Sequence, residues 1–287
     1  MSLLPPTLEA FLAVVRHGTV HGAAREIGLS QTGVTQRLRV LERELGCTLF
    51  VRSRRGMRPT AEGEALVRYA QRAGDLEGEL LALLRPGDPG ASVRVAITGP
   101  SSLMRSRVIP AATSVLAAQP GVALSFVLDD QNAGLSALKS GQAQLAVLPA
   151  DDVVAELDAK PLRPVRQVLV GPPAWAGRDA REVIARERII DFNEGDDATF
   201  AFLREHGLPP AARPRRHLVN NPDALAAMVA GGLGYSVLAG DFAAPWLADG
   251  RLVDLLPGRW LDQDVALAWY PRREMPAYFR ALIDAVD

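Results

Sequence analysis

Apolar residues recur at helical spacing along the first 84 residues and mark one helix after another. The pattern over 8–15 follows two prolines and predicts a helix with Thr7 as its N-cap and Gly18 as its end. A second short helix is expected over 20–28. A third should begin after Ser30, a preferred N-cap residue, and stop at Gly46.

The third helix has two distinct faces. Its apolar residues at 34, 38, 41 and 45 fall within about 60° of one another, and Thr, Gln and Arg occupy the opposite side. Two short helices joined by a tight turn, the second with a polar outer face, form a helix-turn-helix that places the second helix in the major groove of DNA. Gln and Arg side chains bind adenine and guanine edges there. A solvated helix in an ordinary bundle is the alternative.

Residues 47–59 predict a β-hairpin. Leu49 to Val51 are apolar and a charged turn with Gly56 follows. Such a wing would lie beside the helix-turn-helix and bring arginines to the phosphates or the minor groove, which makes binding salt-dependent. The arginines of the wing are Arg52, Arg54, Arg55 and Arg58.

A long helix is expected from Thr60 to about Leu84. Its apolar residues are spaced 3-4-3-4-3, as in the seam of a short coiled coil. We interpret the seam as a dimerisation surface because DNA half-sites normally require a two-fold dimer, and packing of the stripe on the body is the alternative. The seam residues are Leu66, Tyr69, Ala73, Leu76, Leu80 and Leu83. The segment "RPGDPGAS" (85–92) then breaks the helix as a hinge.

Beyond residue 92, short apolar strands alternate with helical segments. Strands over 93–98, 122–130 and 143–149, separated by helices over 101–120 and 133–141, predict a parallel sheet with a ligand at the C-terminal ends of its strands. A second β/α unit follows, and a strand over 264–270 returns the chain to the first unit. The expected domains are 1–59, a linker and hinge over 60–91, and a two-lobed body over 92–287. Lobe I comprises 92–165 and 269–287, and lobe II comprises 166–268, with a cleft between them.

Three loops at this cleft carry polar residues. The segment "TGPSS" (98–102) precedes a helix, where N–H groups and hydroxyls suit a carboxylate, although Ser101 as an ordinary N-cap is an equal alternative. Asp129 and Asp130 end a strand and would bind an ammonium or cap the next helix. In "FNEGDD" (192–197) a helix cap by Asp196 or Asp197 is the simpler interpretation. The ligand-binding candidates are Thr98, Ser101, Ser102, Asp129, Asp130 and Asn193.

The overall net charge of −1 hides a basic head on an acidic body. Residues 1–60 hold nine arginines and four glutamates, a net charge of +5, whereas the rest holds 23 basic and 29 acidic residues, a net charge of −6. This distribution indicates a polyanion partner for the head alone. Chance clustering of the charges is the alternative.

Several classes of protein are disfavoured. Cys47 is the single cysteine, so no intrachain disulfide can form, and no apolar run is long enough to span a bilayer. The N-terminus has no signal-peptide pattern, so we expect a cytoplasmic protein rather than a transported or secreted solute-binding protein. The four histidines lack metal-ligand spacing, and G-x-S-x-G and G-x-G-x-x-G are absent, so we expect neither a metal site, a catalytic site nor a cofactor.

These motifs resemble a known family. "AAREIGLSQTGVTQRLRVLERELGCTLFVR" (23–52), "RPTAEGEAL" (58–66), a linker helix and an α/β body are similar to the LysR-type transcriptional regulators. The resemblance implies a winged helix-turn-helix, a linker-helix homodimer or tetramer, and an effector-binding domain resembling periplasmic binding proteins. It implies promoter DNA, a small-molecule effector and RNA polymerase as partners. By position, the DNA-binding candidates are Ser30, Gln31, Thr32, Thr35, Gln36, Arg39, Arg52, Arg54 and Arg55.

Departures from the family pattern leave some details open. Thr32 stands where the family usually has Pro, and His21 and Gly22 replace a small hydroxyl residue and Ala, so the operator sequence is not determined. "LSFVLDD" and "DFNEGDDATFAFL" resemble the ArgP and LysG branch, which senses basic amino acids. Arg105 and Arg107 depart from the pattern of this branch, because they place two cations near the expected ligand. An architectural DNA-binding protein without an effector is the alternative function.

Overall fold

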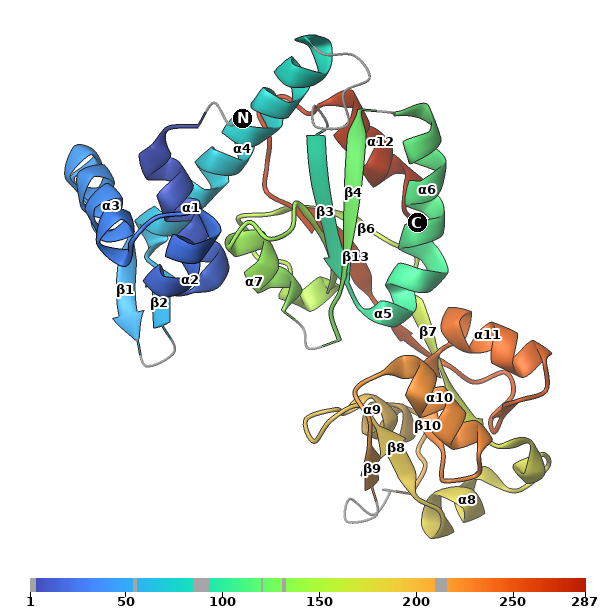
Figure 1. The fold of residues 1–287 in the computed structure, drawn as a ribbon. Coiled ribbons are helices and arrows are strands. Elements are labelled where there is room, and N and C mark those ends of the chain that lie inside the picture. Colours follow the sequence, from blue (N-terminus) through green and yellow to red (C-terminus); the bar gives the residue numbers. More distant parts are fainter. Residues whose placement is uncertain (1–3, 54–55, 85–92, 120, 131–132, 210–215) are drawn as a thin grey trace.

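Figure 1 shows the computed structural model of the chain, which describes residues 4–53, 56–84, 93–119, 121–130, 133–209 and 216–287. A small head lies beside a two-lobed body, and one long helix joins them. The elements of the head and linker are α1 (Pro6–His17), α2 (Val20–Glu26), α3 (Gln31–Leu45), β1 (Phe50–Ser53), β2 (Gly56–Pro59) and α4 (Ala61–Leu84). The predicted order of three helices, a hairpin and a long helix is confirmed.

Individual residues fix the ends of the head helices. The Ser30 side chain accepts a hydrogen bond from the Gly33 N–H at 3.0 Å and caps α3. Gly46 ends α3 with a φ of 67°, a left-handed conformation that glycine adopts without a Cβ clash. The prediction of Thr7 as an N-cap is wrong, because α1 already begins at Pro6. Proline is tolerated in the first turn, where its missing N–H has no helical partner.

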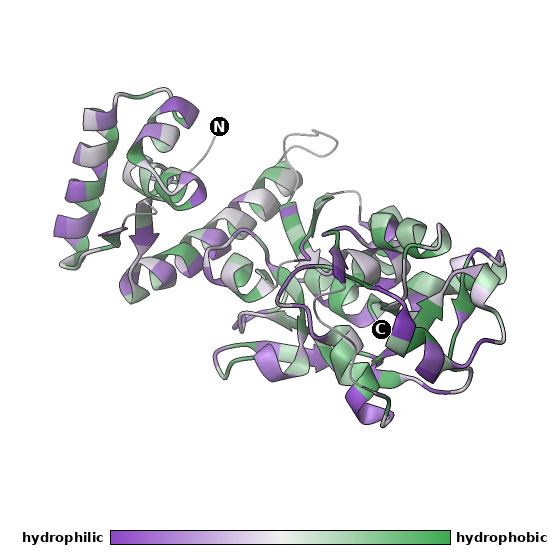
Figure 2. Ribbon diagram, turned by 90° about the horizontal axis from the view of Figure 1, so that it is seen from below, coloured by the Kyte–Doolittle hydropathy of each residue, from purple (hydrophilic) through white to green (hydrophobic). Residues whose placement is uncertain are grey.

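The head has its own hydrophobic core. Apolar residues of the three helices pack with Leu49 and Phe50 from the wing, and the ring centroids of Phe11 and Phe50 lie 5.2 Å apart. Val67 and Ala70 of α4 are buried in the same cluster, which fixes the start of the linker helix to the head. Figure 2 shows the hydrophilic residues of α3 along its outer side, away from α1 and α2.

The first lobe contains a five-stranded sheet in the order β4-β3-β5-β13-β6. β3 runs parallel to β4 and β5, as predicted, but β13 runs antiparallel to β5 and β6. β13 begins at Val265, so residues 265–268 belong to the first-lobe sheet. The predicted bounds of lobe II, 166–268, are therefore wrong for these residues. The elements are β3 (Val93–Gly99), β4 (Val122–Leu128), α7 (Gly134–Lys139), β5 (Leu145–Pro149), β6 (Asp158–Pro161), β13 (Val265–Trp269) and α12 (Ala277–Ala285).

A π-helical turn interrupts the helix predicted over 101–120. α5 (Ser101–Leu103), the π-turn (Met104–Val108) and α6 (Ile109–Ala118) follow one another without a break. Pro110 lacks an N–H, and its ring disfavours a regular α-turn just before it, so a wider turn relieves both problems. This turn carries Arg105 and Arg107.

The second lobe is centred on β7, which pairs antiparallel with β10, β11 and β12. The prediction of a β/α unit here identified β7, β8, α9, α10 and β10 and missed α8, β9, α11, β11 and β12. The elements are β7 (Val165–Gly171), α8 (Ala180–Arg186), β8 (Ile189–Asp191), α9 (Ala198–Glu205), β9 (Arg216–Leu218), α10 (Pro222–Ala230), β10 (Ser236–Ala239), α11 (Gly240–Ala248), β11 (Val253–Asp254) and β12 (Leu261–Gln263).

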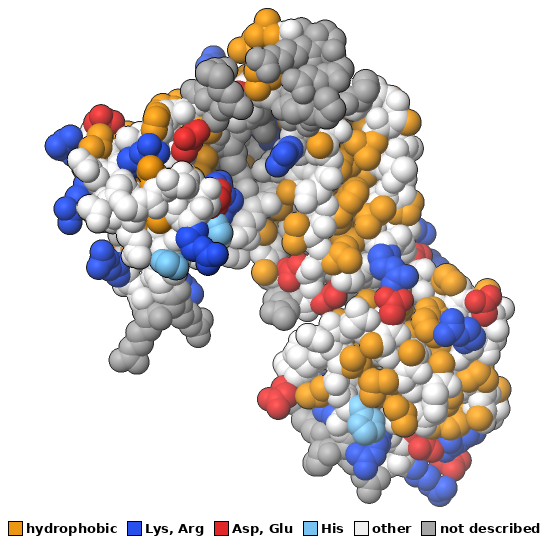
Figure 3. Space-filling model, viewed as in Figure 1, with side chains coloured by type: hydrophobic (Ala, Val, Ile, Leu, Met, Phe, Trp, Pro, Cys, Tyr) orange, Lys and Arg blue, Asp and Glu red, His pale blue; other side chains and the backbone are white. Residues whose placement is uncertain are grey.

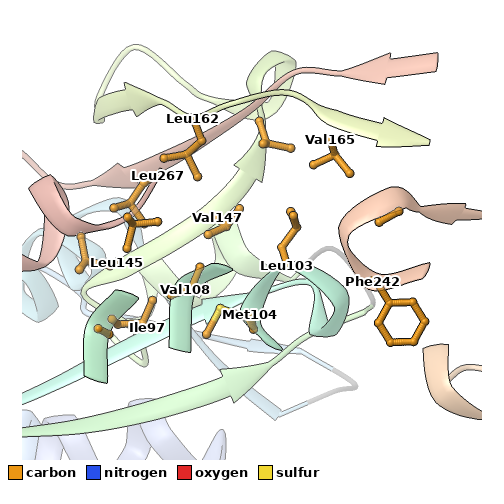
Figure 4. Packing of buried hydrophobic residues seen from close by; sticks show 14 of the residues in the cluster. Ile97, Leu103, Met104, Val108, Leu145, Val147, Leu162, Val165, Phe242 and Leu267 are labelled. Carbon is orange, nitrogen blue, oxygen red and sulfur yellow. The ribbon is translucent and has the colours of Figure 1, made fainter. Parts of the chain in front are cut away.

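Two crossover segments, which lie side by side, connect the lobes. Val165 pairs with Gln263, and the Leu162 N–H donates to the Val265 carbonyl at 3.0 Å. One continuous apolar cluster includes residues of both lobes. Figure 4 shows part of it, where Leu103 of the first lobe and Phe242 of the second approach each other. The lobes are therefore held together by apolar packing as well as by the two crossover segments.

Candidate functional site

The outer face of α3 presents a row of polar side chains. Gln31, Thr32, Gln36 and Arg39 are exposed, whereas Thr35 is half-buried. The Thr35 hydroxyl donates to the Gln31 carbonyl at 2.9 Å, so it is already used within the helix. Val34, Leu38 and Leu41 hold the opposite side in the head core. The helix is thus rigidly seated with its polar face free.

A histidine contacts the first residue of this helix. His21 Nδ1 lies 3.2 Å from Gln31 Nε2, and because the Gln31 amide nitrogen can only donate, Nδ1 is the acceptor of this hydrogen bond. The sequence identified His21 as a departure from the family pattern but gave no role for it. The structure places it where it orients the Gln31 side chain.

A charged cluster ties α1 to α2 in the head. Glu26 accepts hydrogen bonds from Arg16 and lies 2.6 Å from His17 Nε2. The Arg16 hydrogen bond lowers the pKa of Glu26 below its ordinary value, with burial opposing and His17 adding to the effect. Glu26 therefore holds the first two helices together as a carboxylate.

The wing is the predicted hairpin, with Val51 opposite Arg58 and Arg52 opposite Met57. Arg52 and Arg58 are exposed, one on each strand. Arg54 and Arg55 lie outside the described residues. Figure 3 shows basic side chains over the outer surface of the head, in agreement with its net positive charge.

A cavity of about 220 Å³ opens at the C-terminal edge of the first-lobe sheet. Asp129 and Asp152 line it together with Gly99, Leu135 and Pro149. Figure 3 shows acidic side chains gathered at this lower end of the first lobe, beside the second lobe. Sequence reasoning found Asp129 and missed Asp152, although Asp152 also follows a strand of the parallel core.

The predicted anion-binding segment is occupied from within the chain. Asp130 accepts hydrogen bonds from the Ser101 N–H at 2.8 Å and the Ser101 hydroxyl at 2.6 Å. Thr98 is buried, and its hydroxyl donates to the Val127 carbonyl at 3.0 Å. Ser102 is half-buried next to them. Thr98, Ser101 and Asp130 therefore satisfy one another or the backbone and do not face an empty anion site.

The two unexpected arginines are neutralised by the second lobe. Arg105 pairs with Asp223 in the first turn of α10. Arg107 is buried, its Nε donates to Asp241 Oδ2 at 2.6 Å, and its other nitrogens donate to the carbonyls of residues 163 and 164. Each arginine of the π-turn thus connects the first lobe to the N-terminus of a second-lobe helix.

The second-lobe loop that carries Asn193 is held by a buried ion pair. Asp191 is 1% exposed, and it accepts from Arg216 Nε at 2.7 Å and from the Thr199 hydroxyl at 2.9 Å. Burial raises the pKa of Asp191, while Thr199 and Arg216 oppose that shift. Arg216 Nη2 also donates to the Asn193 carbonyl at 3.2 Å. Asn193 itself does not line the 220 Å³ cavity.

The seam of α4 is largely uncovered. Tyr69 is 62% exposed and Leu76 is 66% exposed, and Leu80 is exposed as well. Leu66 packs partly against the head core and Ala73 is half-buried, so neither is fully available. The side chain of Leu83 lies outside the described residues. Packing on the body therefore does not account for this stripe.

Comparisons with known proteins agree with this geometry. Residues 6–64 match the family described as "Bacterial regulatory helix-turn-helix protein, lysR family", and residues 88–287 match "LysR substrate binding domain". The HTH-type transcriptional regulator PtxR of Pseudomonas aeruginosa is 33% identical, over 97% of this chain and 90% of the relative. ArgP of Aeromonas salmonicida is 28% identical, over 88% of this chain and 86% of the relative.

Solved structures share the fold over nearly the whole chain. ArgP from Mycobacterium tuberculosis aligns with a TM-score of 0.77 at 24% identity, covering 99% of this chain and 96% of that chain. Full-length LysG from Corynebacterium glutamicum with bound effector Arg aligns with a TM-score of 0.71 at 24% identity and the same coverage. Within the described residues, every helix is too short or too polar to traverse a bilayer.

One assignment follows from three observations. The polar face of α3 points outward from the head, the body has two lobes, and the two matched family domains together span most of the sequence. The chain belongs to the LysR family and is a DNA-binding transcriptional regulator with a C-terminal effector-binding domain.

Proposed function

We propose that the polar face of α3 contacts base edges in the major groove. The observation that carries this proposal is the seating of α3, whose apolar side is buried in the head while its Gln, Thr and Arg side chains point to solvent. The residues assigned to base contact are Gln31, Thr32, Thr35, Gln36 and Arg39. Ser30 contributes as the cap that fixes the start of α3, where its hydroxyl accepts from the Gly33 N–H.

The wing contacts the DNA backbone in this proposal. Arg52 is exposed on β1, and Arg54 and Arg55 complete the wing by sequence. The test is retention of duplex DNA as salt is raised. Arg52→Ala should weaken binding to all duplexes alike and reduce the slope of log K against log salt by about 1. A loss confined to one DNA sequence would contradict a backbone role.

The effector is a small molecule that carries an amine. Asp129 and Asp152 line the cavity, and Arg105 and Arg107 do not oppose a cation there because Asp223 and Asp241 neutralise them. LysG, a structural relative, was solved with arginine bound. A basic amino acid is therefore the effector we assign. Thr98, Ser101, Ser102 and Asp130 support the cavity from the neighbouring positions of the chain, and Asn193 lies outside it.

The test is a thermal-shift screen of single amino acids against the full chain. A ligand at 100 times its dissociation constant should stabilise the protein by about 2.7 kcal/mol. Lysine or arginine should raise the melting temperature, and Asp152→Asn should abolish that shift. Stabilisation by an aromatic or purely acidic compound, with none from lysine or arginine, would refute the assignment.

Self-association follows from the exposed seam of α4. Tyr69, Leu76 and Leu80 would be covered by a second copy, with Leu66 and Ala73 at the seam's edge. We assign a homodimer or tetramer that binds promoter DNA in the cytoplasm and acts on RNA polymerase, without catalysis or a cofactor. The domains that we assign are 1–59, 60–91 and 92–287. An architectural protein that ignores sequence would retain random DNA as well as promoter DNA.

A further inference from the structure

A small pocket lies where the linker helix meets the body, before the start of β5, whereas the effector cavity lies at the other end of that strand. Its walls come from three segments: α4, the loop before β5 and the residues after β13. α4 packs here against β3 and α7. Gly141 brings the backbone so close that a Cβ there would lie 2.3 Å from Gln71 Nε2. The pocket has a volume of about 20 Å³, room for about one water-sized group.

Three arginines surround this pocket. Arg68 lies with its guanidinium 4.9 Å from the centroid of the Tyr270 ring, and Arg72 donates to the carbonyl of Pro271. Arg272 lies 4.0 Å from the centroid of the Phe279 ring. A guanidinium carries five N–H donors, and the contacts of Arg68 and Arg72 are one ring face and one carbonyl. Most of the donors on Arg68 and Arg72 are left for another partner.

Acceptors are scarce around these donors. Among the described residues, no carboxylate lies within 4.0 Å of Arg68 or Arg72. Gln144, the other amide in the wall, uses its Oε1 to accept from the Ala96 N–H at 2.7 Å. Two buried polar atoms of the pocket have no hydrogen-bond partner within the described structure: Gln71 Nε2, which can only donate, and the Tyr270 hydroxyl, which can donate or accept. A buried donor left unpaired costs free energy, so the pocket is complete only with an acceptor in it.

We propose that this pocket binds a small oxyanion of the phosphate class. One oxygen enters the pocket and accepts from Gln71 Nε2 and Arg68, while the remaining oxygens stay at the mouth beside Arg72, which is exposed. The anion joins the linker helix to two loops of the first lobe. It thereby fixes the direction in which the head projects from the body. This site is separate from both the DNA-binding face and the effector cavity.

The probe is inorganic phosphate, titrated into the full chain against sodium chloride at matched ionic strength. Calorimetry should show saturable binding of phosphate that chloride does not reproduce. Arg68→Gln should weaken phosphate binding by about tenfold, the loss expected when one charge-assisted hydrogen bond is removed. Arg280→Gln, which removes an exposed arginine of α12 outside the pocket, is the matched control and should bind phosphate as the wild type does.

A second variant guards against misfolding of the first. Gln71→Leu removes the unpartnered donor without changing the charge and should weaken phosphate binding several-fold. Hydrogen exchange at residues 66–74 and 141–144 should slow when phosphate is added. Equal stabilisation by chloride, or phosphate binding that survives both pocket variants, would overturn the proposal. An equal loss in Arg280→Gln would do the same, because it would reduce the effect to surface charge.

Discussion

The arginine of the π-turn offers the sharpest test of how the two lobes are held. The side chain of Arg107 is 7% exposed and meets Asp241 through two nitrogens, one at 2.6 Å and one at 2.5 Å. Asp241→Asn keeps the shape of the side chain and removes its charge. Arg107 would then remain buried and charged with neutral acceptors alone, namely the carbonyls of residues 163 and 164 and the amide oxygen of the new asparagine.

The magnitude follows from burial. Removing one partner of a fully buried ion pair costs about 3–5 kcal/mol. Asp241 is 33% exposed, so water recovers part of that loss, and we expect a destabilisation of about 2 kcal/mol. For a domain of this size, each kcal/mol lowers the melting temperature by about 2–4 °C, which gives a decrease of roughly 4–8 °C.

The assay is thermal unfolding followed by circular dichroism, with Glu182→Gln as the matched control. Glu182 pairs with Arg186 one turn away on α8, and both side chains are well exposed. Its loss should cost at most about 0.5 kcal/mol. If Asp241→Asn lowers the melting temperature no more than Glu182→Gln does, the Arg107 pair does not hold the lobes together and our reasoning about the π-turn fails.

Three further predictions follow from the head and linker. Leu76→Asp places a charge on the exposed seam and should shift sedimentation from dimer to monomer at micromolar concentration, and an unchanged sedimentation coefficient would exclude the seam as the interface. Arg16 lowers the pKa of Glu26, so the Glu26 carboxylate stabilises the fold above the ordinary value of 4.5, and this contribution is lost as the pH falls through the lowered pKa. Glu26→Gln should therefore reduce the decline in melting temperature below pH 5, by an amount that corresponds to no more than about 1 kcal/mol. His21→Ala frees the amide of Gln31 and should relax base preference at one position of each half-site by about 1 kcal/mol while the salt dependence stays constant, as measured by binding to single-substitution duplexes.

The helices of the head could be predicted from the sequence because the spacing of apolar residues and the capping residues indicate the same boundaries. Ser30 and Gly46 mark the two ends of α3, and the predicted apolar face is buried at Val34, Leu38 and Leu41, whereas Leu45 in the last turn is exposed. The wing and the long helix were found for the same reason. The N-cap at Thr7 failed because two adjacent prolines already fix the first turn of α1.

The body was harder to predict because its pairing is non-local. The return of the strand over 264–270 to the first lobe was predicted, but the lobe boundary was placed at residue 268, within that strand. The exact point of return depends on pairing with β5 and β6, more than a hundred residues away. The π-turn depends on Pro110, a signal that was present in the sequence. Its ion pairs with Asp223 and Asp241 were not predictable, because the partners come from another lobe.

The candidate effector site was also predicted only in part from the sequence. A polar residue after a parallel strand correctly drew attention to Asp129, which lines the cavity. The segment 98–102 was expected to offer open N–H groups, but Asp130 fills that place from an adjacent loop. Both neighbouring carboxylates bond to the chain, Asp130 to Ser101 and Asp129 to the Ala133 N–H at the start of α7, but Asp129 lines the cavity as well.

The most direct test of the central claim is selection of duplexes from a random DNA library by the wild type and by Arg39→Ala. Wild-type protein should enrich a two-fold symmetric sequence. The variant should lose preference at one matching position in each half-site while it keeps most of its affinity for unspecific DNA. An identical enriched sequence from both proteins would contradict the claim that the outer face of α3 contacts the bases.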